Sequence, residues 1–410
     1  MGESAGGSGA ANPIGTAVHE VYWSDALPWW ILFRAAAWAF TPTVVLLATG
    51  GLLATWAGWS LADRLTLPGA SGRSVASGHS VQIDPAALGD GLAMPLPTAP
   101  ALPAPSAAAM PYARGMLGWV PAPLRQAMQL AATPFSPSAS MSDAGGALAR
   151  LGWFVVVWSI FATAITRHVA LKLVGEESLG LFGSLGYGVK KWPAAFNAAI
   201  FVLLGIFTLS LPAALLGLAM RTEWGLTAVA VIWPLVLAGA IVLSILALGL
   251  AAGWPLMAAN VGVERGDAFQ AISTAFSYVF QRPLHYAFYL AVAGIVLVPS
   301  LFVAGLFADA TATLAVWAAS WGMGHARTAE LLGGLENLAA LPPADAAAAN
   351  ASWGLRGLDF WHRCLASLLG AFGWGYFWAV ITATYLLLRR DVDGTEMDEV
   401  VLAELPGEDA

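Results

Sequence analysis

The sequence predicts an all-α integral membrane protein, a polytopic transmembrane bundle of about six helices with two amphipathic interfacial helices. Hydrophobic residues make up 58% of the chain and charged residues only 10%, whereas a soluble domain carries about 25% charged residues. A chain of this composition cannot cover a water-facing surface along its whole length. Six stretches also reach the roughly 20 apolar residues that a helix needs to cross a bilayer.

The N-terminal part predicts an anchor that stays in the membrane. Residues 1–34 form an expected cytoplasmic segment that ends in "LPWWILFR", whose aromatic residues suit a membrane interface. The segment lacks the basic start of a cleavable signal peptide, so we expect the first span, residues 35–60, to be retained. Pro42 lies within this span, where neighbouring helices can satisfy the carbonyl that it frees.

Residues 61–148 predict an extracytoplasmic linker. They are rich in Ala, Pro and Ser, as in "PLPTAPALPAPSAAAMP". This composition is typical of a flexible or extended chain, because it offers few side chains with which to build a core. We therefore expect no second domain here.

Residues 149–308 form the expected core of four spans, at about 149–170, 194–220, 226–258 and 284–308. The third of these is long and holds Pro234 and Pro255. Because proline removes a backbone hydrogen bond, we expect this helix to be tilted, kinked or broken near one end.

Two segments of this core resemble one another. "VGEESLGLFGSLGYGVKKWP" (174–193) and "VERGDAFQAISTAFSYVFQRP" (263–283) each begin with acids, continue with apolar residues at helical spacing, and end with a tyrosine, a base and a proline. Such spacing predicts an amphipathic helix. Each segment lies between two spans, so the sequence predicts two units, each made of a span, an amphipathic helix and a second span. The two units are either an internal duplication or similar by chance.

The ends of these amphipathic helices can be predicted from their residue types. Ser178 and Asp267 suit the N-cap position, where a side-chain oxygen accepts from a free backbone N–H. We expect Pro193 and Pro283 to end one helix and open the next, because proline is tolerated in the first turn of a helix but not in its interior.

The C-terminal part predicts three further segments. Residues 309–363 are expected to be an extracytoplasmic helical segment, and residues 364–390 to be the last span, which ends in the stop-transfer pattern "LLLRRD". Residues 391–410 hold eight acids and no base. This acidic cytoplasmic tail is either a solvated end or a docking segment for a protein partner.

The distribution of bases predicts the orientation. One set of short loops carries most of the bases: Arg167, Lys172, Lys190, Lys191, Arg265, Arg282, Arg389 and Arg390. The short loop on the opposite side has only Arg221. By the positive-inside rule, both termini are expected in the cytoplasm. We expect a multi-pass protein of the bacterial inner (cell) membrane.

Part of the chain resembles a known group of proteins. "LGLAAGWPLMAANVGVERGDAFQAISTAFSYVFQRPLHYAFY" and "VVVWSIFATAITRHVALKLVGEESLGLFGSLGYGVKKWPAAF" are similar to a family of uncharacterised bacterial multi-pass membrane proteins. They are more distantly similar to the membrane domain of some glycerophosphodiester phosphodiesterases. The resemblance covers roughly residues 150–300 and the final "YLLLRRDVDGTEMDEV". The resemblance implies little about activity, since the family has no established reaction. No catalytic residue carries over, because the soluble phosphodiesterase barrel has no counterpart here.

Eight residues near the two amphipathic segments are candidate contacts for lipid headgroups or a protein partner. Basic side chains at a membrane surface attract anionic lipids, and tyrosines suit the interface. The alternative is that these helices are struts that pack the bundle. The eight are Arg167, Tyr187, Lys190, Lys191, Asp267, Tyr278, Arg282 and His285.

We predict no catalytic residue, metal site or cofactor. The six histidines have no metal-ligand spacing, and no basic stripe exists to bind nucleic acid. The first hypothesis is a non-enzymatic membrane scaffold or assembly component that contacts membrane lipids. The second is a transport or channel subunit, which needs a polar cavity between the two units. The third is a lipid-metabolising enzyme, which needs Glu176, Glu177, Glu264, Asp267, His168 and His285 to converge.

Overall fold

The computed structural model describes residues 27–64, 141–177, 179–339 and 351–395, together with the single positions 127, 130 and 133. Within these ranges the chain forms nine α-helices, one short 3-10 helix and no strand. Six of the helices are long and apolar enough to cross a membrane. The predicted all-α fold with six spans is confirmed, and the chain is a multi-pass membrane protein. Most of the predicted linker, 61–148, lies outside the described residues.

The N-terminal part differs from the single first span predicted at residues 35–60. It consists of η1 (Pro28–Trp30), α2 (Ile31–Ala39) and α3 (Pro42–Arg64). The chain turns at Phe40 and Thr41, and Pro42 opens α3 instead of lying inside a span. The first position of a helix needs no N–H donor and suits the fixed φ of proline. Only α3 is therefore a candidate span here.

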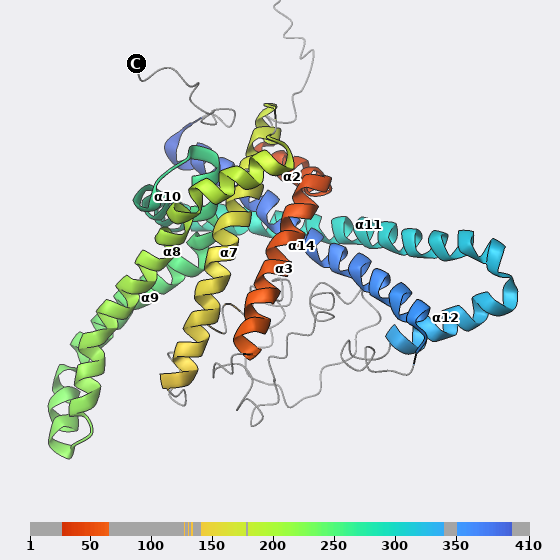
Figure 1. Cartoon of the computed structure of the whole chain (residues 1–410). Helices are drawn as coiled ribbons and strands as arrows, with labels where there is room; N and C mark the ends of the chain where they lie inside the picture. Colours follow the sequence, from red (N-terminus) through yellow and green to blue (C-terminus); the bar gives the residue numbers. More distant parts are fainter. Residues whose placement is uncertain are drawn as a thin grey trace, which may run out of the picture.

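The centre of the bundle is formed by α7 (Met141–Val174), α14 (Trp353–Asp393) and the second half of α9 (Glu223–Glu264), with α3 beside them (Figure 1). Aromatic rings fill this centre. Trp158 of α7 stacks on Trp374 of α14 with ring centroids 4.1 Å apart, and Trp378 lies 5.9 Å from Trp158. All three rings are fully buried, so they fix how α7 and α14 face one another.

Two long helices continue through prolines at which the sequence predicted an end or a break. α8 (Gly180–Ala219) contains Pro193, and α9 contains Pro234 and Pro255. The prediction that Pro193 separates two helices is therefore wrong, and α9 is unbroken. In an apolar environment an unfolded turn would expose several unpaired backbone groups, which costs more than the one hydrogen bond that proline removes.

The second amphipathic segment is a separate helix, α10 (Ala268–Gln281). Its predicted N-cap is confirmed, because the side chain of Asp267 accepts a hydrogen bond of 2.8 Å from the backbone N–H of Gln270. Pro283 opens α11 (Pro283–Met323), as predicted. Ser178, the other predicted N-cap, lies outside the described residues.

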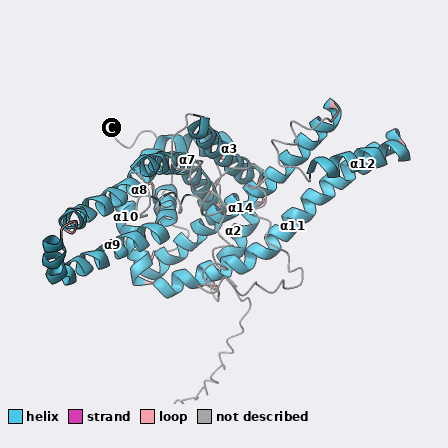
Figure 2. Cartoon of the chain, turned by 90° about the horizontal axis from the view of Figure 1, so that it is seen from below, coloured by secondary structure: helices cyan, strands magenta, loops and turns pink. Residues whose placement is uncertain are grey.

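Two arms extend away from the bundle in different directions (Figures 1 and 2). The hairpin arm consists of residues 207–248, where α8 and α9 meet at their far ends. The outer arm consists of residues 301–368 and contains the end of α11, α12 (His325–Ala339) and the start of α14. In α9 only 6% of the most apolar 18-residue stretch is buried, against 61% in α7. The arms therefore contribute little to the core.

Candidate functional site

The polar groups of the bundle gather at one end, which we call the polar end. Here α7, α9 and α14 finish, α8 and α11 begin, and α10 lies across them (Figure 1). The first helices of the described chain, η1 and α2, lie at the same end of the bundle. Segments that are far apart in the sequence thus meet where their helices begin or finish.

Glu264, the last residue of α9, is the centre of the polar end. Its Oε1 accepts a 2.5 Å hydrogen bond from the Tyr385 hydroxyl and lies 3.1 Å from Nε of Arg389. Its Oε2 accepts from the side-chain amides of Asn260 at 3.3 Å and Gln270 at 3.1 Å. The Glu264 side chain is only 14% exposed. Four donors around one largely covered carboxylate hold this side chain at a fixed position.

Helical spacing explains how these groups converge. Asn260 and Glu264 are four residues apart on α9, and Tyr385 and Arg389 are four apart on α14, so each pair shares one helix face. The turn that follows α9 keeps this face open. Arg265 adopts a left-handed conformation at φ 60°. A side chain at Gly266 would collide with the Asn260 amide, so the cluster requires glycine at this position.

A second group of donors binds the last carbonyls of α9. The Tyr187 hydroxyl donates to the carbonyl of Val261 at 2.7 Å, and Lys191 Nζ donates to that of Arg265 at 3.1 Å. A helix ends with carbonyls that lack backbone partners and carry partial negative charge. Donors from α8 therefore stabilise the end of α9 and join the two predicted units.

Arg167 of α7 contributes to the same carbonyl end. Its Nη1 lies 3.4 Å from the carbonyl oxygen of Gly262 and 3.3 Å from that of Val263. The guanidinium also lies 5.3 Å from the centre of the Tyr187 ring, within the range of a cation–π contact. Arg167 is only 3% exposed, so its positive charge is directed at protein carbonyls.

Two tyrosine–aspartate pairs fix the end of α14. The Tyr278 hydroxyl of α10 donates to the carboxylate of Asp393, and the Tyr289 hydroxyl of α11 donates to Asp391 at 2.6 Å. Burial, together with the hydrogen bond to Asp393, raises the pKa of the Tyr278 phenol. The phenol therefore keeps its proton and acts as a donor across the physiological pH range.

The eight predicted contact residues divide into two groups. Five are engaged within the protein: Arg167, Tyr187 and Lys191 on the end of α9, Asp267 as the N-cap of α10, and Tyr278 on Asp393. The other three are exposed at the surface of the polar end: Lys190, Arg282 and His285. This second group keeps the accessibility that a lipid or partner contact requires.

The contribution of α14 to the polar end was not predicted from the sequence. Tyr385 was assigned to the last span, Arg389 to its stop-transfer pattern, and Asp391 and Asp393 to the tail, yet all four complete the polar end. The spacing of Tyr385, Arg389 and Asp393 at four-residue intervals places them on one helix face. That spacing was a usable signal for a polar contact at the end of the last span.

The side chains required for a lipid enzyme do not meet in one place. Nδ1 of His168 lies 3.3 Å from the Ser184 hydroxyl between α7 and α8, whereas Glu264 binds α14. His285 is exposed and lies beside the Tyr289 ring. Among the described residues, no group of three His, Cys, Asp or Glu side chains could hold a metal ion.

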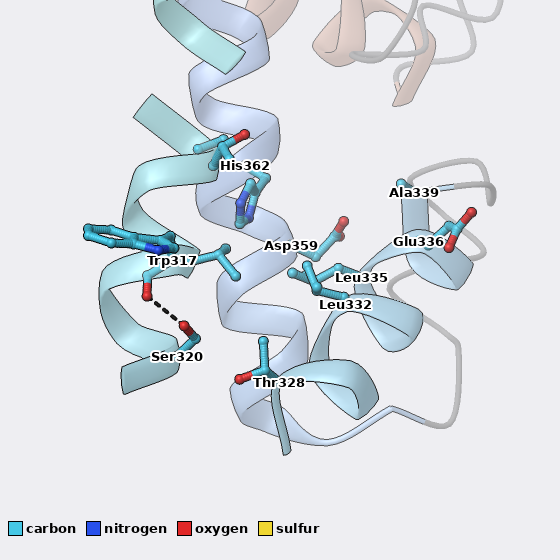
Figure 3. A pocket seen from close by; sticks show the side chains of 12 residues that line it. Trp317, Ser320, Thr328, Leu332, Leu335, Glu336, Ala339, Asp359 and His362 are labelled. Carbon is cyan, nitrogen blue, oxygen red and sulfur yellow. Dashed lines mark hydrogen bonds between the residues drawn. The ribbon is translucent and has the colours of Figure 1, made fainter. Parts of the chain in front are cut away.

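A cavity of about 640 Å³ lies in the outer arm, between α11, α12 and the start of α14. Figure 3 shows the His362 ring and Asp359 between Trp317 of α11 and Leu332 of α12. Nδ1 of His362 is 2.8 Å from the carbonyl of Leu358, and Asp359 accepts from Arg363 at 2.8 Å. His362 and Asp359 are thus bonded within α14, while α11 and α12 add further polar lining residues, among them Ser320, Thr328 and Glu336.

Comparison with known proteins adds no relative. No family model, no characterised protein and no solved structure matches this chain.

Proposed function

We propose that this chain is a non-enzymatic scaffold or assembly component of a bacterial inner membrane, a structural subunit that contacts anionic lipids at its cytoplasmic face. One observation carries the proposal. The hairpin arm and the outer arm leave the bundle as long apolar helices whose flanks are not covered by the rest of the chain. Uncovered apolar flanks in a membrane contact either lipid chains or a neighbouring membrane protein, and we assign them to neighbouring subunits.

The chemistry of the polar end supports a structural role. The carboxylate of Glu264 is occupied by four donors, and the last carbonyls of α9 are occupied by Tyr187, Arg167 and Lys191. Such a network stabilises one packing of the helices. It thereby provides a rigid hub from which the arms extend.

The orientation follows from the charges of the polar end. We place it in the cytoplasm, because Lys190, Arg282 and Arg389 belong to it and basic residues favour the cytoplasmic side. The exposed side chains around these bases include Phe182 at 84% and Leu284 at 82% exposure. Apolar and basic side chains in one belt suit the headgroup region of a membrane that contains anionic lipid.

A transport or channel subunit is the second candidate, favoured by polar atoms in the bundle centre. The hydroxyls of Ser159, Thr163 and Thr384 are buried and make no hydrogen bond with the described residues. Most other helical hydroxyls here bond back to a carbonyl three or four residues earlier, as Thr166 and Thr382 do. Buried polar groups without a protein partner are sites where water can bind.

Native purification in polymer nanodiscs, with mass spectrometry of the co-purified lipids and proteins, tests the proposal. A scaffold is expected to retain stoichiometric protein, either other chains or further copies of itself. A solitary chain surrounded by bulk lipid would contradict the proposal. Ion or solute flux through the purified protein in liposomes would support the channel candidate instead.

A further inference from the structure

The cavity of the outer arm has no part in the proposed scaffold function. Its volume of about 640 Å³ is within the range of pockets that hold small molecules, about 300–1,000 Å³. Such pockets combine apolar walls with a few polar groups that fix the orientation of the ligand. The polar groups that line this cavity therefore indicate which kind of ligand it suits.

Part of the cavity wall is apolar. Val316 of α11 and Leu332 and Leu335 of α12 belong to its lining. Figure 3 shows the side chains of Leu332 and Leu335 directed from α12 toward α14. Because apolar surface gains free energy when it leaves water, a ligand with an apolar chain would be bound better here than a wholly polar one.

Two hydroxyl groups of the lining use their protons within their own helices. Ser320 donates to the carbonyl of Trp317 at 2.6 Å, and Thr328 donates to that of Gly324 at 2.9 Å. A hydroxyl has one proton and two lone pairs, so both groups can only accept from a ligand. The third hydroxyl of the lining, Thr313, can donate or accept.

His362 presents an acceptor as well. Its Nδ1 lies 2.8 Å from the carbonyl oxygen of Leu358. A carbonyl can only accept, so Nδ1 carries the proton of the neutral ring and Nε2 carries a lone pair. Nε2 can therefore accept a hydrogen bond from a ligand in the cavity.

Two carboxylates complete the polar lining, and only one of them is paired with a base. Asp359 accepts from Nε of Arg363 at 2.8 Å, and its side chain is 14% exposed. Glu336 of α12 is exposed and forms no ion pair with any described residue. Figure 3 shows the Asp359 carboxylate between the His362 ring and the helix that carries Glu336. The lining therefore carries an excess of negative charge.

This lining suits an organic cation better than other ligands. Among the described residues that form the cavity, none is a lysine or an arginine, so an anion would meet only carboxylates and lone pairs. A metal ion requires several ligands that converge, and no three His, Cys, Asp or Glu side chains of the described ranges do so. An ammonium group instead offers three N–H donors and one positive charge.

We propose that the cavity binds a primary alkylammonium group, which is a protonated amine attached to an apolar chain. The ammonium lies among Asp359, Glu336 and Nε2 of His362, and the chain rests on Leu332 and Leu335. A lipid headgroup that ends in an amine and a free amphiphilic amine both have this chemistry. The inference does not depend on the scaffold function, since the ligand can bind whether or not the arms contact other subunits.

Calorimetric titration of the full-length chain with hexylamine tests the site. Hexylamine is protonated at neutral pH, as the lysine side chain is, and hexanol has the same chain without the charge. Both are titrated in the same uncharged detergent, and the heat of a titration into detergent alone is subtracted. We expect saturable binding of hexylamine, and binding of hexanol that is weaker by roughly fivefold or more.

Three variants locate the binding site. Glu336→Gln should weaken hexylamine binding roughly fivefold, the effect of losing one partly screened charge pair, and should leave hexanol binding unchanged. The matched control is Glu330→Gln, which removes another exposed acid of α12 that is bonded to Arg327 and lies outside the cavity lining. It should not change binding. Val316→Trp fills the cavity and should abolish the binding of both ligands.

Measurement of the unfolding temperature shows whether each variant folds. If Val316→Trp does not fold, Glu336→Gln decides the case, because exchange of an exposed side chain outside any ion pair changes stability little. The inference is overturned if hexylamine does not bind or if hexanol binds equally well. It is also overturned if Glu330→Gln weakens binding as much as Glu336→Gln does, or if a folded Val316→Trp variant keeps native affinity.

Lipid analysis of native nanodiscs then separates the two sources of the amine. Enrichment of phosphatidylethanolamine that is lost in Glu336→Gln identifies a lipid headgroup as the ligand. Bulk lipid composition, together with the expected binding of hexylamine, identifies a free amine. Either result supports the site, and neither alters the outcome expected for the scaffold function.

Discussion

The Tyr385 hydroxyl donates a 2.5 Å hydrogen bond to the carboxylate of Glu264, although 121 residues separate them in the chain. Arg389 binds the same carboxylate one helical turn later. The last residue of α9 is thereby fixed to the end of α14. Because α9 is also bound by Tyr187 and Lys191 of α8, a single helix end joins both predicted units to the last span.

Replacing Glu264 should destabilise the fold strongly. Glu264→Ala removes the carboxylate that accepts from Tyr385 and lies 3.1 Å from Arg389, whose side chain is 12% exposed. Loss of one partner of a largely buried ion pair costs about 3 kcal/mol. We expect the unfolding temperature in detergent to fall clearly, and tryptophan fluorescence during heating measures it.

The control for this prediction is Glu177→Ala, which removes an exposed acid near the start of α8 and should leave stability almost unchanged. Equal stability of Glu264→Ala and the native chain would mean that the cluster does not hold α9 to α14.

Close packing between α7 and α9 predicts a second sensitive position. A side chain at Gly262 would collide with Thr166 and approach the backbone of Arg167. Gly262→Ala should therefore cost about 1–3 kcal/mol, the usual penalty for overpacking. Gly152→Ala, in an open part of α7 with no atom within 4 Å, should instead be neutral or stabilising, because alanine favours the helix. A reversed order in thermal stability would contradict the packing of α7 on α9.

The spans could be predicted because a bilayer demands long apolar helices, and composition alone records that demand. Their ends were harder to predict. Pro42 opens α3, whereas Pro193 lies inside α8, and the same residue type gives no local sign of the difference. Whether a helix begins at a proline depends on where the preceding residues pack. Before Pro42, α2 packs against α14 and not in line with α3.

For the contacts of the polar end, the sequence predicted one partner of each pair and not the other. The bases and tyrosines of the amphipathic segments were identified, but their partners are backbone carbonyls of α9 and acids of α14. A carbonyl carries no signal in the sequence, and the pairing of Tyr278 with Asp393 spans 115 residues. Such contacts depend on how the helices pack, which no local pattern records.

The tryptophans of the bundle centre offer a test of internal hydration. Trp59 donates its indole N–H to the carbonyl of Arg150 at 3.1 Å, whereas the indole N–H of Trp374 has no partner among the described residues. Both rings are almost fully buried. Trp59→Phe should therefore cost about 1 kcal/mol more than Trp374→Phe, the value of one hydrogen bond. Equal losses of thermal stability would indicate that Trp374 bonds to internal water, which would favour the channel candidate.

The exposed bases of the polar end predict where anionic lipid binds. Lys190 and Arg282 are exposed, whereas Lys191 donates to the carbonyl of Arg265. Each base near an anionic surface contributes about 1 kcal/mol, so Lys190→Gln with Arg282→Gln should reduce the enrichment of phosphatidylglycerol in native nanodiscs by roughly thirtyfold. Lys191→Gln serves as the matched control, because it should lower thermal stability and leave lipid enrichment nearly unchanged. The prediction is wrong if Lys191→Gln abolishes the lipid enrichment and the double variant does not. In that case Lys191 of α8 is the lipid contact, and Lys190 and Arg282 are not.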